Sequence, residues 1–360
     1  MRIVVAMSGG VDSSTAAALL KEQGHDVIGV TLKTHTAAHH QARVCCTTDV
    51  LNDALRVALH LQIPFEVQNC QEAFGREVIL PFVAAYQDGR TPNPCIACNE
   101  RIKFGLLWER ARALGATRIA TGHYARLETD SHGRTALRRG RDAAKDQSYF
   151  LYRQVAVLDR ALFPVGGYTK VEVRALAARF GLPVAEKIES QEICFVGADG
   201  YAATVERLAG GGRPGPILDP AGKVLGRHDG VHHFTLGQRH GLGVSAPTPL
   251  YVTAIDAMSG EVRVGRQEDL LVRVVELADV VWGERAIGPD QVVGVQQRYR
   301  DRARPARVRL GEKGRAIVTF VEPTPRAAPG QAAVVYDGDE VLGGGVVVRS
   351  HVEVTPAVHA

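Results

Sequence analysis

Strand-like and helix-like segments alternate through the first half of the 360-residue chain. The runs IVVAM (3–7) and DVIGVTLK (26–33) have the length and apolar composition of buried strands. Between them, SSTAAALLKEQG (13–24) places apolar residues at helical spacing, and Gly24 ends the predicted helix. This order predicts an α/β domain with a parallel sheet and helices on both faces. Ligands of such domains bind beyond the carboxyl ends of the strands.

Two later segments extend this pattern. NERIKFGLLWERARALG (99–115) predicts a long helix that begins near Asn99, and ATRIATGHYARL (116–127) predicts a further strand. After about residue 205 the chain becomes rich in glycine and proline, and short alternating runs predict one or two small β barrels or sandwiches. DGDE (337–340) is a predicted hairpin turn. We expect domains at 1–204, 205–264 and 265–360, because the chain is longer than one compact core usually is.

The composition excludes several classes of protein. The sequence contains no run of about eighteen apolar residues, so we expect no membrane span and no membrane partner. MRIVVAMSGG (1–10) is too short and too rich in glycine for a signal peptide, and six cysteines are too sparse for a disulfide scaffold. We therefore expect a cytoplasmic protein in a reducing compartment. The net charge of +4 is a weak indication of a polyanionic partner.

The segment SGGVDSS (8–14) joins the first predicted strand to the first predicted helix. Glycines let backbone amides approach a ligand closely, the helix N-terminus is the positive end of its dipole, and Ser13 and Ser14 add hydroxyl donors. Such a loop suits a phosphate or pyrophosphate, and Asp12 would orient the loop or meet Mg²⁺. It is not a Walker A loop, because no Gly-Lys-Ser/Thr follows. The alternative is an ordinary tight turn with a serine cap.

Three cysteines stand out. Cys95 and Cys98 form a C-x-x-C beside the helix predicted to begin near Asn99, where a thiol ionises more readily and becomes a better nucleophile. Cys194 follows about a hundred residues later in SQEICFVG (190–197). Taken alone, Cys194 would be a buried core residue, and the C-x-x-C could be half of a zinc site. No second C-x-x-C completes such a site.

The loop resembles the PP-loop of the ATP pyrophosphatases, which cleave ATP between its α and β phosphates and adenylate a substrate. The longer resemblance is to the tRNA-specific 2-thiouridylases, and it runs from residue 1 to PGQAAVVYDGDEVLGGG (329–345). The motifs that carry it stand in the family's order: MSGGVDSS, GRTPNPCIACNERIKF, ATGHYAR, KDQSYFL, LFPVGGYTKVEVR, SQEICFVG and FTLGQRHGLGV. The resemblance implies a PP-loop domain of the adenine nucleotide α-hydrolase-like class, followed by two small β-rich domains.

The family transfers sulfur to C2 of the wobble uridine (position 34) in the tRNAs for Lys, Glu and Gln. The resemblance implies that Cys98 is the nucleophile and that Cys194 carries the incoming persulfide, delivered by a sulfur-carrier protein. It implies an ATP site formed by Ala6, Met7, Ser8, Gly9, Gly10, Val11, Asp12, Ser13, Leu32 and Gly122. Contacts to the target base are expected from Asn93, Pro94 and Cys95. Contacts to the rest of the tRNA are expected from His123, Lys145, Asp146, Gln147, Arg298, Tyr299 and Gln331.

The implied chemistry starts with adenylation of the C2 oxygen, which makes that oxygen a good leaving group and releases pyrophosphate. The persulfide sulfur on Cys194 then attacks C2, directly or after Cys98 releases it as sulfide. Either route leaves a transient Cys98–Cys194 disulfide, for which the two Cα atoms must come within roughly 7 Å. Many relatives have Asp where this chain has Cys95, and three thiols could instead hold a 4Fe–4S cluster with one open iron. In LFPVGGYTKVEVR, Gly167 stands where an acid is common, and we expect only a minor surface effect.

Two arginine-rich stretches, 136–151 and 298–310, could follow the phosphates of the RNA; the alternative for 298–310 is a solvated strand face. Cys70 is predicted to be a buried thiol at the end of a strand. Cys45 and Cys46 beside His35, His39 and His40 are a weaker indication of a metal site, because adjacent cysteines bridge one metal poorly. We expect His232 and His233 to be turn or core residues. Two rival functions remain: another PP-loop ligase or amidotransferase, and a non-enzymatic RNA-binding or iron–sulfur scaffold.

Overall fold

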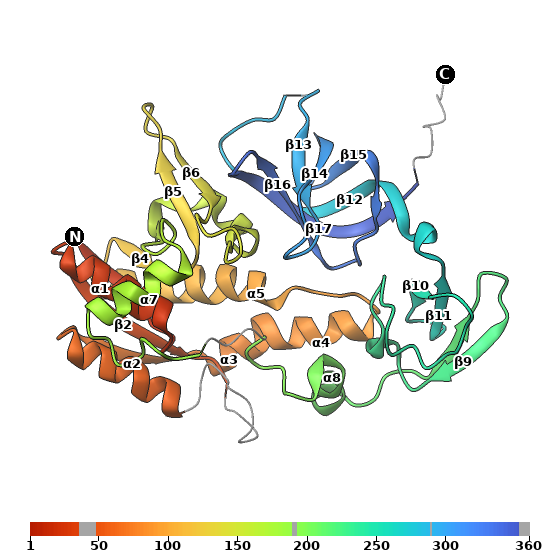
Figure 1. Cartoon of the computed structure of the whole chain (residues 1–360), viewed down its shortest axis with the longest axis horizontal. Helices are drawn as coiled ribbons and strands as arrows, with labels where there is room; N and C mark the ends of the chain where they lie inside the picture. Colours follow the sequence, from red (N-terminus) through yellow and green to blue (C-terminus); the bar gives the residue numbers. More distant parts are fainter. Residues whose placement is uncertain (36–47, 189–192, 289, 353–360) are drawn as a thin grey trace. The chain divides into compact units, whose positions relative to one another are not determined.

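The computed structural model describes residues 1–35, 48–188, 193–288 and 290–352, which form two compact units (Figure 1). The first unit comprises Met1–Leu80, Pro94–Ala198 and the short segment Asp339–Leu342. The second comprises Pro81–Asn93, Asp199–Gly338 and the chain from Gly343 onward. No helix in the described ranges combines the length and the apolar character needed to cross a bilayer.

A five-stranded parallel sheet forms the centre of the first unit, in the order β3-β2-β1-β4-β7. Its strands are β1 (Arg2–Ala6), β2 (Asp26–Lys33), β3 (Phe65–Asn69), β4 (Arg118–Ala120) and β7 (Ala161–Leu162). Strand order runs outward in both directions from β1, so the loops that follow β1 and β4 meet at a topological switch point.

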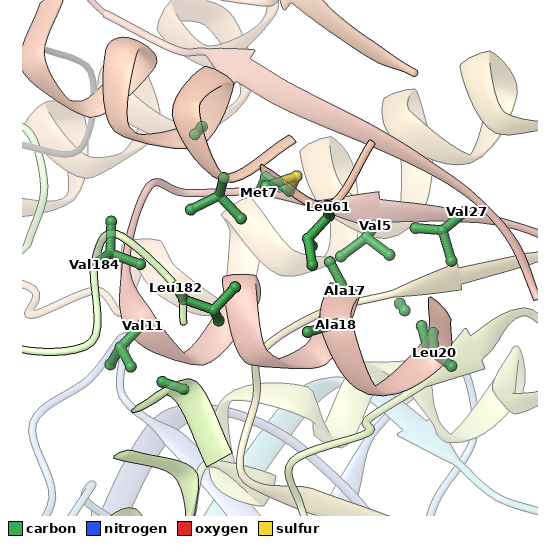
Figure 2. Close-up of a cluster of buried hydrophobic side chains, with 14 of the residues drawn as sticks. Val5, Met7, Val11, Ala17, Ala18, Leu20, Val27, Leu61, Leu182 and Val184 are labelled. Carbon is green, nitrogen blue, oxygen red and sulfur yellow. The ribbon is translucent and has the colours of Figure 1, made fainter. Parts of the chain in front are cut away.

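Helices cover both faces of this sheet, as the alternating pattern predicts. They include α1 (Val11–Glu22), α2 (Thr48–His60), α6 (Leu107–Ala113) and α7 (Lys170–Arg179). Val5 of β1 packs on one face with Ala17 of α1 and Leu61 beyond α2, as Figure 2 shows. Val4 points to the opposite face and packs against Leu107 of α6. Because β1 is buried on both faces, its sequence is a continuous apolar run rather than an alternating one.

Two boundaries differ from the sequence-based expectation. The predicted helix at 99–115 begins earlier, at Pro94, and runs through α5 (Pro94–Ala97), the π-helix η2 (Cys98–Leu106) and α6. Proline favours the first position of a helix, so it starts this one rather than leading up to it. The segment predicted as one strand at 116–127 is two, β4 and β5 (Ala125–Thr129), separated by the loop that holds Gly122.

The other elements of the first unit connect the strands and helices described above along the chain. They are α3 (Gln71–Phe74), the π-helix η1 (Gly75–Ile79), the hairpin strand β6 (Thr135–Arg139) and the 3-10 helices η3 (Ser148–Ala156) and η4 (Leu158–Arg160). Helix α4 (Leu80–Gln87) follows η1 directly. In the first unit Asp339 forms ion pairs with Arg126 and Arg138, and Glu340 forms one with Arg134.

The second unit is mostly β structure. A four-stranded sheet has the order β10-β11-β8-β9, with strands β8 (Gly215–Leu218), β9 (Val224–His228), β10 (Tyr251–Asp256) and β11 (Glu261–Gly265). Helix α8 (Gly200–Ala209) and the 3-10 helices η5 (Val231–His233) and η6 (Gln267–Leu270) accompany it. Val252, Val262 and Phe234 belong to a separate core of this sheet.

Six strands then close into a barrel, because β12 pairs with both β15 and β17. They are β12 (Leu271–Trp282), β13 (Val293–Gln296), β14 (Arg304–Leu310), β15 (Ala316–Pro325), β16 (Ala332–Asp337) and β17 (Glu340–His351). The predicted DGDE turn joins β16 to β17, with Gly338 at φ +60°. The predicted fold class, a parallel-sheet domain followed by β-rich domains, is confirmed.

Candidate active site

The loop between β1 and α1 has a conformation that only glycine accommodates at its centre. Gly9 lies at φ +63°, and a Cβ there would be 2.4 Å from the backbone oxygen of Val50. Gly10 is the residue that precedes α1, and no side chain caps the helix there. The first amides of α1 therefore point into the loop, which is the arrangement that binds phosphate at a helix N-terminus.

The serine hydroxyls do less than the sequence suggested. Ser14 is fully buried, and its hydroxyl donates to the carbonyl of Gly10 at 2.8 Å. Ser13 accepts from the amide of Ser8 at 3.1 Å, and its hydroxyl lies 3.1 Å from that of Ser8. These bonds hold the loop in shape. The donors for a phosphate are thus chiefly backbone amides rather than the hydroxyls of Ser13 and Ser14.

Gly122 lies where the switch point of the sheet would place it. A Cβ on this residue would be 2.5 Å from the amide nitrogen of Ser13 and 2.7 Å from the carbonyl carbon of Asp12. The loop after β4 therefore touches the backbone of the loop after β1. This contact agrees with the expectation that both belong to one nucleotide site, since a side chain at Gly122 would fill the same space.

Asp12 is held by two side chains that the sequence analysis did not assign. Its Oδ1 accepts from Lys170 Nζ at 2.6 Å and from the hydroxyl of Tyr124 at 2.7 Å. Gln147 fixes Tyr124 in turn, because its Oε1 accepts from the backbone amide of Tyr124 at 3.0 Å. Lys170 begins α7, whose N-terminus carries a capping box with Thr169. Asp12 therefore orients a lysine beside the phosphate loop.

A second lysine lies against the same loop. Lys187 donates to the carbonyl of Gly9 at 2.9 Å and to Asp53 at 2.6 Å. Two ammonium groups thus flank a loop that presents amide donors, which suits a polyanionic phosphate chain. The only sequence signal for Lys170 was its place in the GYTK stretch, and no pattern singled out Lys187.

Both candidate thiols and the predicted adenine contact pack against one small core. Its buried members are Cys70, Phe74, Val78 and Ile102. Leu32 of β2, Cys98 at the start of η2, and Cys194 in the turn after Ile193 all lie against it. Cys98 and Cys194 are half-buried, and no disulfide joins them among the described residues. The prediction for Cys70 is confirmed, because it is 2% exposed and directly follows β3.

The position of Cys95 and Cys98 differs from the expected one, since neither precedes the helix. Cys95 is the second residue of α5 and Cys98 begins the π-helix η2. Cys95 therefore lies closer than Cys98 to the helix N-terminus, which is the positive end of the helix dipole. π-helical turns occur often at functional sites, because the wider turn redirects side chains.

Asn99 is a further residue that sequence reasoning missed. It is 2% exposed, and its Nδ2 donates to the carbonyl of Phe150 at 3.1 Å. Its Oδ1 is buried without a hydrogen-bond partner among the described residues. A buried acceptor without a partner is costly, and a ligand donor would remove that cost. Asn99 therefore joins the C-x-x-C to the KDQSYFL stretch and offers an acceptor beside Cys98.

His123 is buried, at 8% exposure, and neutral. Burial lowers the pKa of its imidazole well below the ordinary value, and the nearby Lys103 ammonium lowers the pKa further. Lys103 can only donate, so Nε2 is the acceptor at 3.5 Å, and Nδ1–H donates to Thr121 Oγ1 at 2.7 Å. Any contact between His123 and RNA would thus be made by a neutral ring.

Because the folded-state pKa of His123 is depressed, acid should destabilise the protein through this residue. The unfolded chain binds more protons below its pKa of about 6.5, so each pH unit below that value costs up to about 1.4 kcal/mol. We expect His123→Gln to lower stability at pH 7.5 and to flatten the decline between pH 7 and 5. Urea unfolding of both proteins across that pH range measures the free energy of unfolding. An equally steep decline in the variant would contradict the depressed pKa of His123.

Lys145, Asp146 and Gln147 lie in the segment before η3. Asp146 accepts from Arg139 at 2.7 Å and from the backbone amide of Gly140 at 3.0 Å, so its carboxylate holds the protein's own loop. Arg138 likewise pairs with Asp339. The stretch 136–151 is therefore less positive than its sequence suggests.

The remaining predicted tRNA residues belong to the second unit. Gln331 donates through Nε2 to the carbonyl of Thr91 at 2.9 Å, and the amide of Thr91 donates to Pro329 at 2.8 Å. These bonds fix the approach to Asn93, which is one of the residues expected at the target base. Arg298 donates to the carbonyl of Arg326 at 2.8 Å. The guanidinium of Arg300 stacks on Tyr299 at 5.5 Å from the ring centroid.

Some predictions cannot be placed. The group around Cys45 and Cys46, with His39 and His40, lies outside the described residues, as do Ser190–Glu192 of SQEICFVG. Gly167 is exposed, and a Cβ there would meet nothing within 4 Å. This agrees with the small surface effect expected at that position.

Comparisons with known proteins cover nearly the whole chain. Residues 1–198 match the model of the tRNA methyl transferase HUP domain, residues 205–266 that of the tRNA methyl transferase PRC-barrel domain, and residues 273–347 that of the aminomethyltransferase beta-barrel domain. The tRNA-specific 2-thiouridylase MnmA of Geobacter metallireducens is 50% identical over 352 residues, or 96% of each chain. The protein of the same name from Moorella thermoacetica is 51% identical over 353 residues, covering 96% of this chain and 98% of the relative. A solved 4-thiouridine synthetase–RNA complex with bound ATP has a TM-score of only 0.35 at 17% identity, covering 54% of this chain and 44% of the other.

Proposed function

The chain belongs to the tRNA-specific 2-thiouridylase family, and on that premise we propose that it thiolates C2 of the wobble uridine in the tRNAs for Lys, Glu and Gln. Uridine thiolation by an ATP-using PP-loop enzyme is the activity of this family. The observation that carries the proposal to these residues is the single core on which Leu32, Cys98 and Cys194 converge. It puts the expected adenine contact and both thiols into one neighbourhood of the first unit.

The first step is adenylation of the base. The C2 oxygen of uridine attacks the α phosphorus of ATP, and pyrophosphate leaves. Amides of the loop at 8–14, together with Lys170 and Lys187, would receive the charge that develops on the leaving phosphates. Asp12 holds Lys170 in position and, when Mg²⁺ is bound, is the carboxylate of the loop that could ligate it.

The second step replaces oxygen with sulfur. The terminal sulfur of a persulfide on Cys194 attacks C2, and AMP leaves with the former C2 oxygen. The thiolate of Cys98 then attacks the inner sulfur of Cys194, which releases the thione and forms a Cys98–Cys194 disulfide. Alternatively, Cys98 first attacks Cys194, and the released sulfide attacks C2. A sulfur-carrier protein supplies the persulfide, and a reductant reopens the disulfide.

Cys95 admits a different sulfur chemistry. It lies one helical turn before Cys98 in the same helical segment, so both thiols occupy one side of it. Together with Cys194 these thiols could hold a 4Fe–4S cluster whose open iron binds sulfide. Iron and acid-labile sulfide analysis after anaerobic purification separates the two mechanisms: an active, iron-free protein supports the persulfide route.

The proposal is tested with purified chain, unmodified tRNA, ATP and a persulfide donor. We expect retardation of the tRNA on a mercury gel together with stoichiometric AMP and pyrophosphate. Another PP-loop ligase would consume ATP without retarding the tRNA under any sulfur supply. A scaffold without catalytic activity would produce no AMP, and either result would overturn the proposal.

Arg298 provides a separate test of the RNA interface. We expect Arg298→Ala to weaken tRNA binding several-fold and to reduce the slope of log affinity against log salt by about one, because one phosphate contact is lost. Filter binding from 50 to 200 mM salt measures both quantities. Arg315→Ala, which removes an exposed arginine from a barrel turn, is the matched control. Equal slopes for wild type and Arg298→Ala would exclude the residue from the interface.

A further inference from the structure

Two neighbouring histidines and a glutamate converge in the second unit, and none of the three has a role in the proposed function. Glu206 lies on α8, and His232 and His233 lie on the 3-10 helix η5. Their three ligand atoms all lie within 4.8 Å of one another. The sequence analysis expected both histidines to be turn or core residues. They do occupy a turn, and His232 is 1% exposed, but both point their Nε2 atoms to one carboxylate.

The distances are those of a small convergent site. His232 Nε2 lies 3.1 Å from Glu206 Oε1, and His233 Nε2 lies 3.0 Å from the same oxygen. The two rings lie 4.3 Å apart between centroids with their planes 37° apart, so neither ring blocks the other. Donors that share a tetrahedral ion lie about 3.3 Å apart, given metal–ligand bonds of about 2.0 to 2.1 Å. A small adjustment would therefore admit an ion between them.

The fold builds a slot for the imidazole of His232. A Cβ on Gly212 or on Gly230 would lie 2.3 Å from atoms of this ring, so only glycine at both positions leaves room for it. The ring is thereby fixed from two sides with its Nε2 directed at Glu206. Glu206 and His233 are 42% and 39% exposed at their side chains, so an ion could enter from solvent. The geometry is thus rigid on one side and open on the other.

We propose that Glu206, His232 and His233 form a structural site for a divalent transition metal of the zinc class. Two imidazoles and one carboxylate are the donors that Zn²⁺ accepts, and solvent would fill the fourth position. The ion would tie α8 to the turn at 231–233 within the second unit, and it would stabilise the folded chain by binding it in preference to the unfolded one.

One feature of the site limits its affinity. Metal binding at Nε2 places the ring proton of His232 on Nδ1, and Nδ1 is buried without a hydrogen-bond partner among the described residues. Loss of such an outer partner costs roughly 10- to 100-fold in metal affinity. The dissociation constant for the metal should therefore be well above that of a closed structural zinc site, which means weaker binding. Titrations with micromolar metal are suited to it.

The test uses the untagged full chain, treated with chelator and then titrated with Co²⁺ under reducing conditions. Co²⁺ on nitrogen and oxygen donors gives a weak visible band, whereas thiolate ligands add an intense near-ultraviolet band, so the cysteines are distinguished from this site. We expect the weak visible band, competition by Zn²⁺ and a higher unfolding temperature with metal. His233→Ala and Glu206→Gln should each weaken binding at least tenfold, while His240→Ala, an exposed histidine of the same unit, should not.

Three results would overturn the proposal. The first is no Co²⁺ signal at micromolar metal, and the second is only the thiolate band. The third is a visible band and a thermal shift that His233→Ala and Glu206→Gln leave unchanged. Both substitutions are at partly exposed side chains, so the variants should fold. Because tRNA thiolation is not the readout, failure here would leave the proposed function untouched.

Discussion

Replacing either Cys98 or Cys194 with serine should abolish 2-thiouridine formation while tRNA-dependent pyrophosphate release from ATP continues. In the proposed mechanism, adenylation involves only the phosphate loop, its lysines and the base, whereas sulfur transfer involves both thiols. Serine has nearly the shape of cysteine but cannot carry a persulfide or form a disulfide. We expect a loss of at least about a thousandfold in thiolation, as for other essential nucleophiles. Mercury-gel retardation and a coupled pyrophosphate assay, run on the same reactions, measure the two steps.

Cys70 offers the matched control. It belongs to the core on which Cys98 and Cys194 pack, but it is buried and we assign it no chemistry. Cys70→Ala should lower stability by about 1 kcal/mol through the small cavity it leaves, and should keep thiolation within a few-fold. Thiolation that survives Cys98→Ser or Cys194→Ser at the wild-type rate would refute the assigned roles. An equal loss of pyrophosphate release would indicate a collapsed site rather than a missing nucleophile.

Cys95→Asp extends this comparison to the iron–sulfur alternative. Cys95 is only partly buried and aspartate is close to cysteine in size, so the substitution should be tolerated structurally. Under the persulfide route, thiolation by Cys95→Asp should stay near the wild-type rate, because Cys98 and Cys194 suffice. Under the cluster route it should fall with the loss of an iron ligand. Activity and iron content measured on the same preparation distinguish the two.

The fold was largely predictable because its signals are local. The apolar runs of β1 and β2 and the helical spacing of α1 identify a parallel sheet, and Gly24 ends α1 at φ +79°. The start of the helix at Pro94 was missed, because a proline directly before the C-x-x-C is equally compatible with an extended approach to the helix. The split of 116–127 was missed for a different reason. The break at Gly122 follows from a contact with Ser13, and such a contact has no local signal.

The site was predictable where its residues are contiguous and hidden where they are not. The loop at 8–14 and the C-x-x-C are visible in single stretches of sequence. Lys170 and Lys187 lie more than 150 positions from the loop they flank, and the sequence offers nothing that pairs them with Asp12 or Gly9. Glu206 with His232 and His233 is similar, because α8 and η5 meet only in the folded unit. Long-range convergence of common residue types leaves no pattern in one chain.

Gly122→Ala should cost the enzyme most of its ATP-dependent activity through a single methyl group. The added Cβ would lie 2.5 Å from the amide nitrogen of Ser13 and 2.7 Å from the carbonyl carbon of Asp12, and backbone cannot yield as a flexible side chain can. The phosphate loop would have to move, and with it the amides and the Asp12–Lys170 pair. Because misplacement by about 1 Å can cost 100-fold, we expect about that loss in kcat/KM for ATP in the pyrophosphate assay.

Gly167→Ala is the control for this variant, since it makes the same chemical change in the same unit at an exposed position with no atom within 4 Å. It should leave kcat/KM for ATP within about twofold and stability within about 0.5 kcal/mol. Overpacking at Gly122 should in addition cost about 1–3 kcal/mol, so kinetics are compared at a temperature where both variants are folded. If Gly122→Ala retains wild-type kcat/KM for ATP, the loop after β4 does not define the shape of the phosphate loop. The nucleotide site would then have to be sought elsewhere along the carboxyl ends of the sheet.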